Sequence, residues 1–460
     1  MNEERGAAQP DSRESPPGAG GASGRGEGIR NPRARQRALL IAAAPDEPDL
    51  SELRELLRTA RVAVAGELTQ RRPRPDPDRY LGKGKLAELK VAIKQTDANL
   101  IACDDELAPR QERNLEQEIG VPVIDRTAII LDIFADHAGS AEGKLQVELA
   151  QLEYNLARMR GLWTHLERLG AGRMDSGIGT RGPGETQIET DRRLARDRIA
   201  ALRRRLERTR ATRATMRRER ERAHLPTVAL AGYTNAGKST LLNALTGADA
   251  GVRDRLFHTL DLTTRSFEIS GRDYLLIDTV GFIRKLPHQL VEAFGATLEE
   301  TLRADLIVHV VDASSSADDM DEMIRAVESV LAGIAAAERP QLLALNKVDL
   351  LDDEHRRELG FVHPHATQLS AATGEGLEEL RSAIEAEFLR ALLPMDLLVP
   401  YRDGGRLAEL HDVAGELERE DTPEGARVRA RVPAGVAARF ERFAISADRN
   451  GVGPDDDPVG

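Results

Sequence analysis

The sequence predicts an α/β protein made of four parts: an N-terminal α/β domain, a long antiparallel helical hairpin, a second α/β domain with a phosphate-binding loop (P-loop), and a small C-terminal α+β appendage. Short apolar runs alternate with helix-like segments over residues 37–138, which is typical of an α/β sheet. Leucines recur at helical spacing in residues 143–169, and the pattern G-x-x-x-x-G-K-[ST] stands at residues 232–239. At 460 residues the chain is too long for a single core.

Both ends of the chain are expected to be disordered tails. Residues 1–36 are rich in Gly, Pro, Ser, Arg and Glu and almost lack large apolar side chains, and residues 447–460 have the same character. Between them, the first domain is expected at residues 37–138. Its expected strands are 38–42, 61–65, 99–103 and 121–124, and its expected helices are 50–57, 85–93 and 108–119. The glycine-containing segment 80–85 superficially resembles a phosphate loop, but it lacks the full spacing, so we expect a turn that opens a helix.

Residues 139–222 are expected to form the helical hairpin. The first helix carries a heptad seam of Leu145, Leu149, Leu152, Leu156 and Met159. Segment 170–184 contains six glycines and one proline, so it is expected to be the tip loop. The second helix should follow from about residue 186 to 222, with four apolar residues on one side: Leu194, Ile199, Leu202 and Leu206.

The second helix of the hairpin is strongly basic. Residues 190–222 contain fourteen arginines and five acidic residues. One interpretation is a solvated face with i,i+4 ion pairs. The other, which we favour, is an RNA-binding face, because arginine contacts phosphate in a fixed fork geometry. The predicted RNA contacts on the helix and its tip are Arg173, Arg181, Arg203, Arg204, Arg205, Arg208 and Arg210.

A phosphate-binding loop is predicted at residues 232–240, between an apolar run at 227–231 and a helix-like segment at 241–245. Backbone amides of such a loop hold phosphate oxygens, Lys238 should reach the β and γ phosphates, and the Ser239 hydroxyl should bind Mg²⁺. A chance match in a glycine-rich loop is the alternative. The predicted nucleotide-binding residues here are Gly232, Tyr233, Thr234, Asn235, Ala236, Gly237, Lys238, Ser239 and Thr240.

Two further motifs lie in the domain expected at residues 226–390, and the second of them indicates guanine rather than adenine. Asp278-Thr279-Val280-Gly281 ends an apolar run, where Asp278 suits Mg²⁺ ligation through water and Gly281 can approach a γ-phosphate. In Asn346-Lys347-Val348-Asp349, a carboxylate suits the N1–H and 2-amino donors of guanine. The alternative for Asp349 is a helix N-cap. Ser370-Ala371-Ala372 is either an ordinary turn or the last base-contacting loop of a GTPase.

Two positions bear on hydrolysis and on Mg²⁺. The residue after Gly281 is Phe282, where many GTPases have a glutamine that orients the attacking water. Phe282 either packs in a loop or makes intrinsic hydrolysis slow, and we favour the second interpretation. Segment 257–265 offers three threonines that could complete the Mg²⁺ coordination: Thr259, Thr263 and Thr264.

The order of these parts resembles the HflX family of ribosome-associated GTPases, over roughly residues 37–390. The resemblance rests on the nucleotide motifs and on segments 80–86, 104–107, 125–127, 142–152 and 182–186. It implies that Thr259 is the Mg²⁺-binding threonine and that Phe257, His258, Leu260 and Asp261 lie at the nucleotide with it. It also implies that Phe282 is normal for the family. The partners that it implies are GTP or GDP, the large ribosomal subunit and its rRNA, and some members of the family split stalled ribosomes.

Composition sets the remaining expectations. The net charge of −12 argues weakly against nonspecific nucleic-acid affinity, and the single cysteine, Cys103, excludes an internal disulfide. No apolar run approaches a membrane span, so we expect no membrane insertion and a place in the cytoplasm. We also expect a monomer, and a small C-terminal domain at residues 395–446. The leading function is a GTPase that splits or rescues stalled ribosomes. Its rivals are a GTPase for large-subunit assembly and a GTP-gated ribosome-binding module with incidental hydrolysis.

Overall fold

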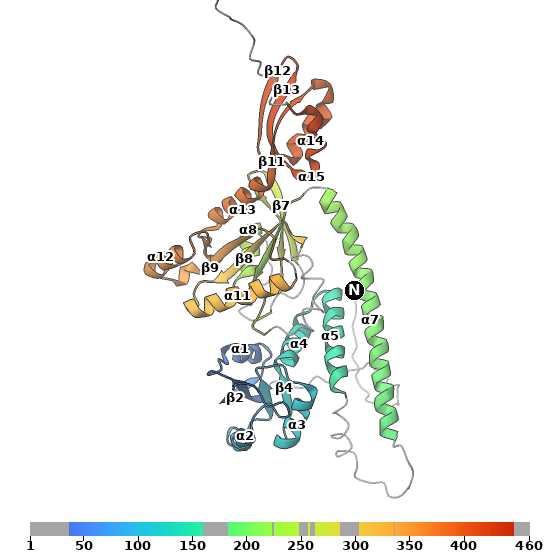
Figure 1. The fold of residues 1–460 in the computed structure, drawn as a ribbon, viewed down its shortest axis with the longest axis vertical. Coiled ribbons are helices and arrows are strands. Elements are labelled where there is room, and N and C mark those ends of the chain that lie inside the picture. The colour runs from blue at the N-terminus through green and yellow to red at the C-terminus, as the bar shows by residue number, and fades with distance from the viewer. Residues whose placement is uncertain are drawn as a thin grey trace, which may run out of the picture.

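A computed structural model describes residues 36–159, 183–222, 225–247, 256–257, 263–285, 303–334 and 336–445. Three sheets follow one another along the long axis of the molecule, and one long helix lies beside the lower two (Figure 1). The predicted tails at residues 1–36 and 447–460 lie outside the described residues except for Gln36, as does most of the predicted tip loop, residues 170–182.

The N-terminal sheet has the strand order β2-β1-β3-β4, and all its pairings are parallel. Its strands are β1 (Arg37–Ala44), β2 (Ala63–Arg71), β3 (Leu100–Cys103) and β4 (Val123–Asp125). Its helices are α1 (Ser51–Thr59), α2 (Lys83–Thr96), α3 (Pro109–Ile119) and α4 (Arg126–His137). The strands β1 and β3 are buried on both faces, because side chains of α1 and α4 pack on one face and those of α2 and α3 on the other. Segment 80–85 is a turn that opens α2, as predicted.

Two details of this domain differ from the sequence prediction. Strand β2 extends to Arg71, well beyond the predicted end. Helix α4 was not predicted, although most of its side chains are buried. It begins at Arg126 because Asp125 caps it, accepting a hydrogen bond from the Ala128 amide.

Helices α5 (Ala141–Arg158) and α7 (Pro183–Arg222) pack side by side, as predicted for the hairpin (Figure 1). The leucine seam of α5 meets Ile199, Leu202 and Leu206 of α7 in one apolar cluster. The prediction for Leu194 was wrong, because its side chain is 58% exposed and the neighbouring Ala195 is buried instead. Ala195 continues the 4-3-4 spacing of the seam, whereas Leu194 lies one position away from it.

The central sheet has the strand order β10-β9-β8-β5-β7-β6, in which only the β6–β7 pairing is antiparallel. Its strands are β5 (Thr227–Gly232), β6 (Thr263–Ile269), β7 (Arg272–Asp278), β8 (Leu306–Asp312), β9 (Gln341–Asn346) and β10 (Thr367–Gln368). Its helices are α8 (Lys238–Thr246), α11 (Ala317–Gly333), the short 3-10 helix η2 (Val348–Leu350), α12 (Asp353–Val362) and α13 (Leu377–Ala391). The carboxyl ends of the parallel strands meet at one edge, which is where ligands bind in such sheets.

The C-terminal sheet is antiparallel, with the order β11-β13-β12. It consists of β11 (Leu392–Val399), β12 (Leu417–Thr422) and β13 (Gly425–Pro433), and side chains of α14 (Gly404–Val413) and α15 (Ala434–Ala437) cover one face. The 3-10 turns η3 (Tyr401–Asp403) and η4 (Glu441–Phe443) complete it. The fold class predicted from the sequence is therefore confirmed.

Candidate nucleotide-binding site

The predicted phosphate loop joins the end of β5 to the start of α8 at the carboxyl edge of the central sheet. Its conformation requires glycine at Gly237, where φ is +92° and an added Cβ would lie 2.2 Å from the Asn346 side-chain nitrogen. Asn235 also has a left-handed backbone, with φ of +62°. A loop with such backbone turns can point successive amides toward an anion.

Lys238 and Ser239 lie where the loop enters α8. The Lys238 ammonium is buried and donates to the carbonyl oxygens of Gly232 at 3.0 Å and Tyr233 at 2.8 Å. Burial lowers the pKa of Lys238 to about 8, although the charge of Asp278 opposes this shift. Ser239 donates from Oγ to Asp278 Oδ2 at 2.7 Å. A hydroxyl and a carboxylate side by side are the hard oxygen ligands that Mg²⁺ prefers, so these two residues fit the predicted metal.

Asn346 connects the predicted base-reading motif to the phosphate loop. Its Nδ2 donates to the Ala236 carbonyl at 2.8 Å, and its Oδ1 accepts from the Ala371 amide at 2.9 Å. Lys347, with a left-handed φ of +69°, forms an ion pair with Asp312 at 2.5 Å. The structure therefore brings the motifs at residues 232–239, 346–349 and 370–372 together, at the edge where β5, β8 and β9 end.

The alternative role of Asp349 as a helix cap is not what the structure shows. Asp349 is exposed in the short helix η2, and Asp352 is the residue that caps α12, accepting from the amides of Glu354 and His355. Ser370 is fully buried, and its Oγ accepts from the Thr373 amide at 3.2 Å. Both observations are compatible with a base-contacting role, which stays a prediction.

The segment that should complete the Mg²⁺ coordination is only partly described. Thr259 lies outside the described residues, together with His258, Leu260 and Asp261. Thr263 and Thr264 begin strand β6, where Thr263 pairs with Asp278. Phe257 is described and buried, and its ring meets Phe134 of α4 edge to face, with centroids 4.6 Å apart. The Phe257 side chain thus contacts the N-terminal domain.

Phe282 packs inside the central domain. Its side chain is 2% exposed and clusters with Ala231, Ile307, Val327 and Leu331. Its amide donates to the Gly232 carbonyl at 3.1 Å, and its own carbonyl accepts from the Thr234 amide at 2.7 Å. In this conformation Phe282 packs in the core, which was one of the two interpretations of the sequence. A phenyl ring in this position cannot hydrogen-bond and orient the attacking water molecule.

Sequence reasoning missed His309, which lies in the middle of β8 and is 4% exposed. Burial first, and then the nearby charge of Lys238, lower the pKa of His309 to about 4. Its imidazole is therefore neutral at pH 7, which avoids a second buried cation behind the phosphate loop. A lone histidine in an apolar strand gave no signal of this in the sequence.

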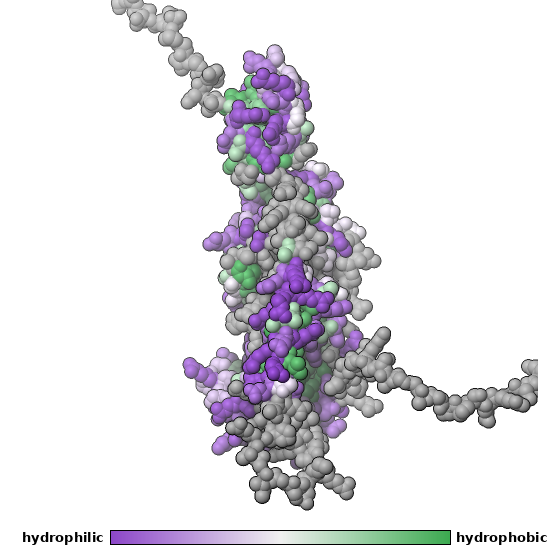
Figure 2. Space-filling view, turned by 90° about the vertical axis from the view of Figure 1, so that its right-hand side faces the viewer, coloured by the Kyte–Doolittle hydropathy of each residue, from purple (hydrophilic) through white to green (hydrophobic). Residues whose placement is uncertain are grey.

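The arginines between residues 198 and 208 of α7 are all exposed, and two of them form ion pairs with α5. Arg198 and Arg203 form ion pairs of 2.7 Å with Glu148 and Glu153 of α5. Arg204, Arg205 and Arg208 are exposed, and Figure 2 shows a largely hydrophilic surface along the described part of this helix. Arg173, Arg181 and the Arg210 side chain lie outside what the structure describes.

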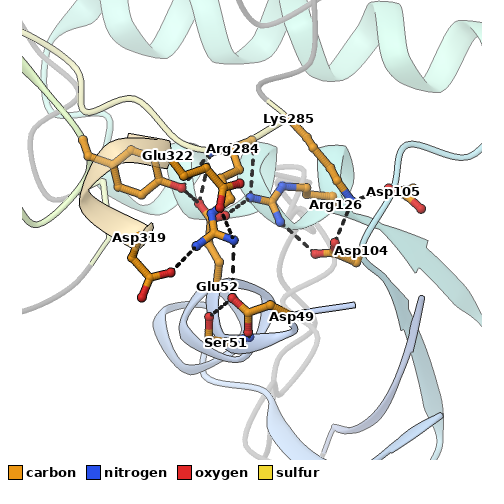
Figure 3. A network of polar contacts seen from close by, with 11 residues as sticks. Asp49, Ser51, Glu52, Asp104, Asp105, Arg126, Arg284, Lys285, Asp319 and Glu322 are labelled. Carbon is orange, nitrogen blue, oxygen red and sulfur yellow. Dashed lines mark hydrogen bonds and ion pairs between the residues drawn. The ribbon is translucent and has the colours of Figure 1, made fainter. Parts of the chain in front are cut away.

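A polar network between the N-terminal domain and the residues after Gly281 was also missed (Figure 3). It links Glu52, Asp104 and Arg126 to Tyr233, Arg284 and Lys285. Apart from Tyr233, which was predicted only as part of the phosphate loop, each of these residues reads in the sequence as an ordinary polar residue. The only local signal is that Asp104 and Arg126 directly follow apolar strands.

Comparison with known families and proteins covers most of the chain. Residues 47–135 match the family model described as "GTP-binding GTPase N-terminal", residues 137–220 "GTP-binding GTPase Middle Region", and residues 227–347 "50S ribosome-binding GTPase". The chain is 46% identical over 421 residues to "GTPase HflX" of Caldanaerobacter subterraneus, covering 90% of this chain and 95% of that protein. It is 45% identical over 390 residues to "GTPase HflX" of Escherichia coli, covering 84% and 90%.

Among solved structures, a GTP-binding protein from Sulfolobus solfataricus in complex with GDP is 26% identical and matches 76% of this chain and 97% of its own, with a TM-score of 0.40. In the part of the chain that the structure describes, no helix is both long and apolar enough to cross a membrane. The phosphate loop, the guanine motif beside it and the matches along nearly the whole chain lead to one conclusion. The chain belongs to the HflX family of GTPases.

Proposed function

We propose that this protein binds the large ribosomal subunit in a GTP-dependent manner and splits or rescues stalled ribosomes. The main support is that one chain combines a phosphate loop and a predicted guanine motif, at one edge of the central sheet, with the exposed, arginine-rich helix α7. We call the helix pair α5 and α7 the arm. The match of residues 227–347 to a family described as ribosome-binding supports the choice of partner. The arm supplies cations for rRNA phosphates, and the central domain supplies the nucleotide switch.

In this proposal Lys238 neutralises the β and γ phosphates and Ser239 binds Mg²⁺, with Asp278 holding the metal's water shell. Thr259 would complete the metal site in the GTP form. When bound, Mg²⁺ would offset the negative charge that develops on the phosphates as GTP is hydrolysed. Asp349 reads the guanine edge, with the loop at 370–372 beside it.

Hydrolysis is proposed to be slow in the free protein and stimulated by ribosomes. Phe282 is the reason, because its ring is packed in the core and offers no hydrogen bond to a water molecule. Some group other than the residue after Gly281 must then position the water, and ordering of the loops on the ribosome is one way to supply it. The single cysteine, buried at Cys103, agrees with action in the reducing cytoplasm.

The test is the rate of GTP hydrolysis with and without purified large subunits. A slow rate alone and a large increase with subunits would support the proposal, whereas a fast rate alone or no stimulation would contradict it. A sucrose gradient separates splitting from large-subunit assembly. Splitting lowers the amount of intact ribosomes when protein and GTP are added, whereas an assembly factor leaves immature subunits when its gene is deleted.

A further inference from the structure

In α/β sheets, ligands usually bind in a crevice at the topological switch point, and we use the word crevice for the corresponding edge of the N-terminal sheet. The chain passes from β1 to β2 on one side and then crosses to β3 on the other side of β1, so the topological switch point lies between β1 and β3. Ligands of such sheets bind there, at the carboxyl ends of the strands. Around this edge lie Glu52 near the start of α1, Asp104 and Asp105 after β3, and Arg126 after β4.

A segment of the GTPase domain occupies this crevice. Lys285 places its Nζ 2.9 Å from Asp104 Oδ2 and 2.5 Å from Asp105 Oδ1 (Figure 3). Arg126 is 2% exposed, and its guanidinium donates to the Arg284 carbonyl oxygen at 2.9 Å. The same guanidinium forms ion pairs with Glu52 at 2.6 Å and Asp104 at 2.9 Å, so its position is fixed from three sides.

The phosphate loop takes part in the same contact through Tyr233. Its hydroxyl donates to Glu52 Oε1 at 2.6 Å and accepts the Arg284 amide at 2.8 Å. The second residue of the phosphate loop therefore ties the N-terminal domain to the segment that follows Gly281. Its ring, 7% exposed, belongs to the apolar core of the N-terminal domain together with Phe257, Val280 and Ile283.

The side chain of Arg284 adds contacts with both domains. It lies 3.4 Å from Asp49 in the N-terminal domain, and 3.5 Å and 3.3 Å from Asp319 and Glu322 of α11 in the GTPase domain. An arginine between carboxylates of two domains contributes to their relative placement. These pairs are partly exposed, so each contributes little alone.

We propose that this crevice is a binding site whose ligand is the segment 281–285 of the same chain, and that it holds the segment in the GDP form and releases it in the GTP form. The crevice thus positions segment 281–285, which includes the Gly281 amide expected to contact the γ-phosphate. The inference depends on guanine-nucleotide binding by this chain and not on its binding to ribosomes.

The direction follows from how closely Gly281 lies on the phosphate loop. A Cβ added at Gly281 would be 2.8 Å from Thr234 Cγ2 and 3.1 Å from Lys238 Nζ. The oxygens of a γ-phosphate must lie between Lys238 and the Gly281 amide, so they displace this segment outward. The displacement moves Arg284 and Lys285 away from the carboxylates of the crevice.

The backbone of Lys285 indicates that the crevice holds this segment against a local cost. Its φ is +50°, in the left-handed region that a residue with a Cβ seldom adopts. The ion pairs of its ammonium with Asp104 and Asp105 offset that cost. Once the ion pairs of Lys285 are lost, the backbone strain favours another conformation of this segment.

Linkage then makes the effect measurable. If the crevice prefers the GDP form, weakening it must raise the affinity for GTP relative to GDP by the same factor. We therefore compare Lys285→Met and Tyr233→Phe with the wild type, using full-length protein without ribosomes. Lys90→Met is the matched control, because Lys90 also forms a lysine–carboxylate pair on the N-terminal domain, with Glu118 at 2.6 Å, outside the crevice.

The ratio of GTP-analogue affinity to GDP affinity should rise about threefold in Lys285→Met, whose ammonium is half exposed, and about tenfold in Tyr233→Phe, which loses a bond to a charged group. Lys90→Met should leave the ratio unchanged. Hydrogen exchange followed by mass spectrometry should show peptides over 100–106 and 280–285 protected with GDP and less protected with a non-hydrolysable GTP analogue. In Tyr233→Phe the GDP form should exchange like the GTP form.

Equal protection of these peptides with both nucleotides in the wild type would overturn the inference. It would also be overturned if Tyr233→Phe weakened both nucleotides equally, because that is the behaviour of a merely structural loop residue. Protein that binds neither nucleotide would refute the nucleotide site as well. If hydrogen-exchange protection depends on the nucleotide but the protein does not bind ribosomes, the inference is supported and the proposed ribosomal function is contradicted.

Discussion

Asn346 donates a hydrogen bond of 2.8 Å to the carbonyl oxygen of Ala236, so the end of the strand before Asp349, the predicted base-contacting residue, is held against the phosphate loop. The two residues are 110 positions apart in the chain. The other end of the same amide accepts from Ala371. One buried side chain therefore fixes the spacing between the place for the base and the place for the phosphates.

Replacing Asn346 with alanine should weaken binding of both GTP and GDP. The Ala236 carbonyl and the Ala371 amide would lose their partner in a buried site, which costs roughly 1–3 kcal/mol each. Isothermal titration with both nucleotides measures the loss. The control is Asn114→Ala, which removes a half-buried asparagine of the N-terminal domain whose Nδ2 donates to the Asp78 carbonyl. Unchanged affinity for both nucleotides would show that the bridge does not position the site.

Asp349→Asn should shift the preferred base from guanine toward xanthine. The amide presents a donor where guanine needs an acceptor, which should cost GTP binding roughly 2–4 kcal/mol. Competition between GTP and xanthosine triphosphate measures the shift, and Asp352→Asn three residues later is the matched control, since Asp352 caps α12. An unaltered base preference in Asp349→Asn would refute the assignment.

GTP affinity should fall as the pH rises above about 8, the pKa to which burial lowers Lys238. Phosphates favour the charged ammonium, so the complex holds the proton to higher pH than the free protein does. Affinity then falls by up to about tenfold per pH unit between the two pKa values and is level below them. Lys238→Arg stays charged throughout, so its affinity profile should be flat; a falling profile in this variant would place the titrating group elsewhere.

Two pairs of arginines on α7 should differ in their contribution to ribosome binding. Arg204→Ala with Arg205→Ala removes exposed cations, and should weaken binding to the large subunit and reduce the slope of log affinity against log salt by about 1.5. Arg198→Ala with Arg203→Ala removes cations that are already paired with Glu148 and Glu153, so its effect on the slope should be smaller. Equal effects of the two double variants, measured by filter binding across salt concentrations, would count against a specific RNA-facing side.

Phe282→Ala should destabilise the protein without speeding hydrolysis. The ring is buried among Ala231, Ile307, Val327 and Leu331, and the cavity should cost about 3–5 kcal/mol of unfolding free energy. Thermal denaturation and single-turnover hydrolysis without ribosomes are the measurements, with the conservative Phe282→Leu as control. Faster intrinsic hydrolysis in Phe282→Ala would mean that the ring itself obstructs the reaction.

The sequence contains enough local information to predict the nucleotide edge. Lys238, Ser239 and Asp349 stand in short motifs whose strand–loop–helix context is readable within ten residues, and the structure places them at one sheet edge. The phase of α7 was harder, because Leu194 and Ala195 differ by one position and hydrophobicity alone favours the leucine. Packing against α5 selects the alanine instead.

The crevice could not have been predicted in this way. Glu52 and the Arg284 amide are 232 positions apart, and Arg126 and the Arg284 carbonyl are 158 apart. No periodicity or motif connects such residues, and singly each would be interpreted as a surface charge. The buried Arg126 is informative only once its partners from both domains are known.

The apolar core shared by Phe134, Tyr233, Phe257 and Val280 also sets an order of events during synthesis. The N-terminal domain leaves the translating ribosome well before the residues that cover its α1–α4 face have been made. Roughly 150 residues separate the two, which takes on the order of ten seconds at ordinary rates of protein synthesis. During that interval the apolar α1–α4 face of the nascent N-terminal domain is exposed to solvent. Chaperone binding and aggregation should therefore be concentrated on this face until the GTPase domain has been synthesised.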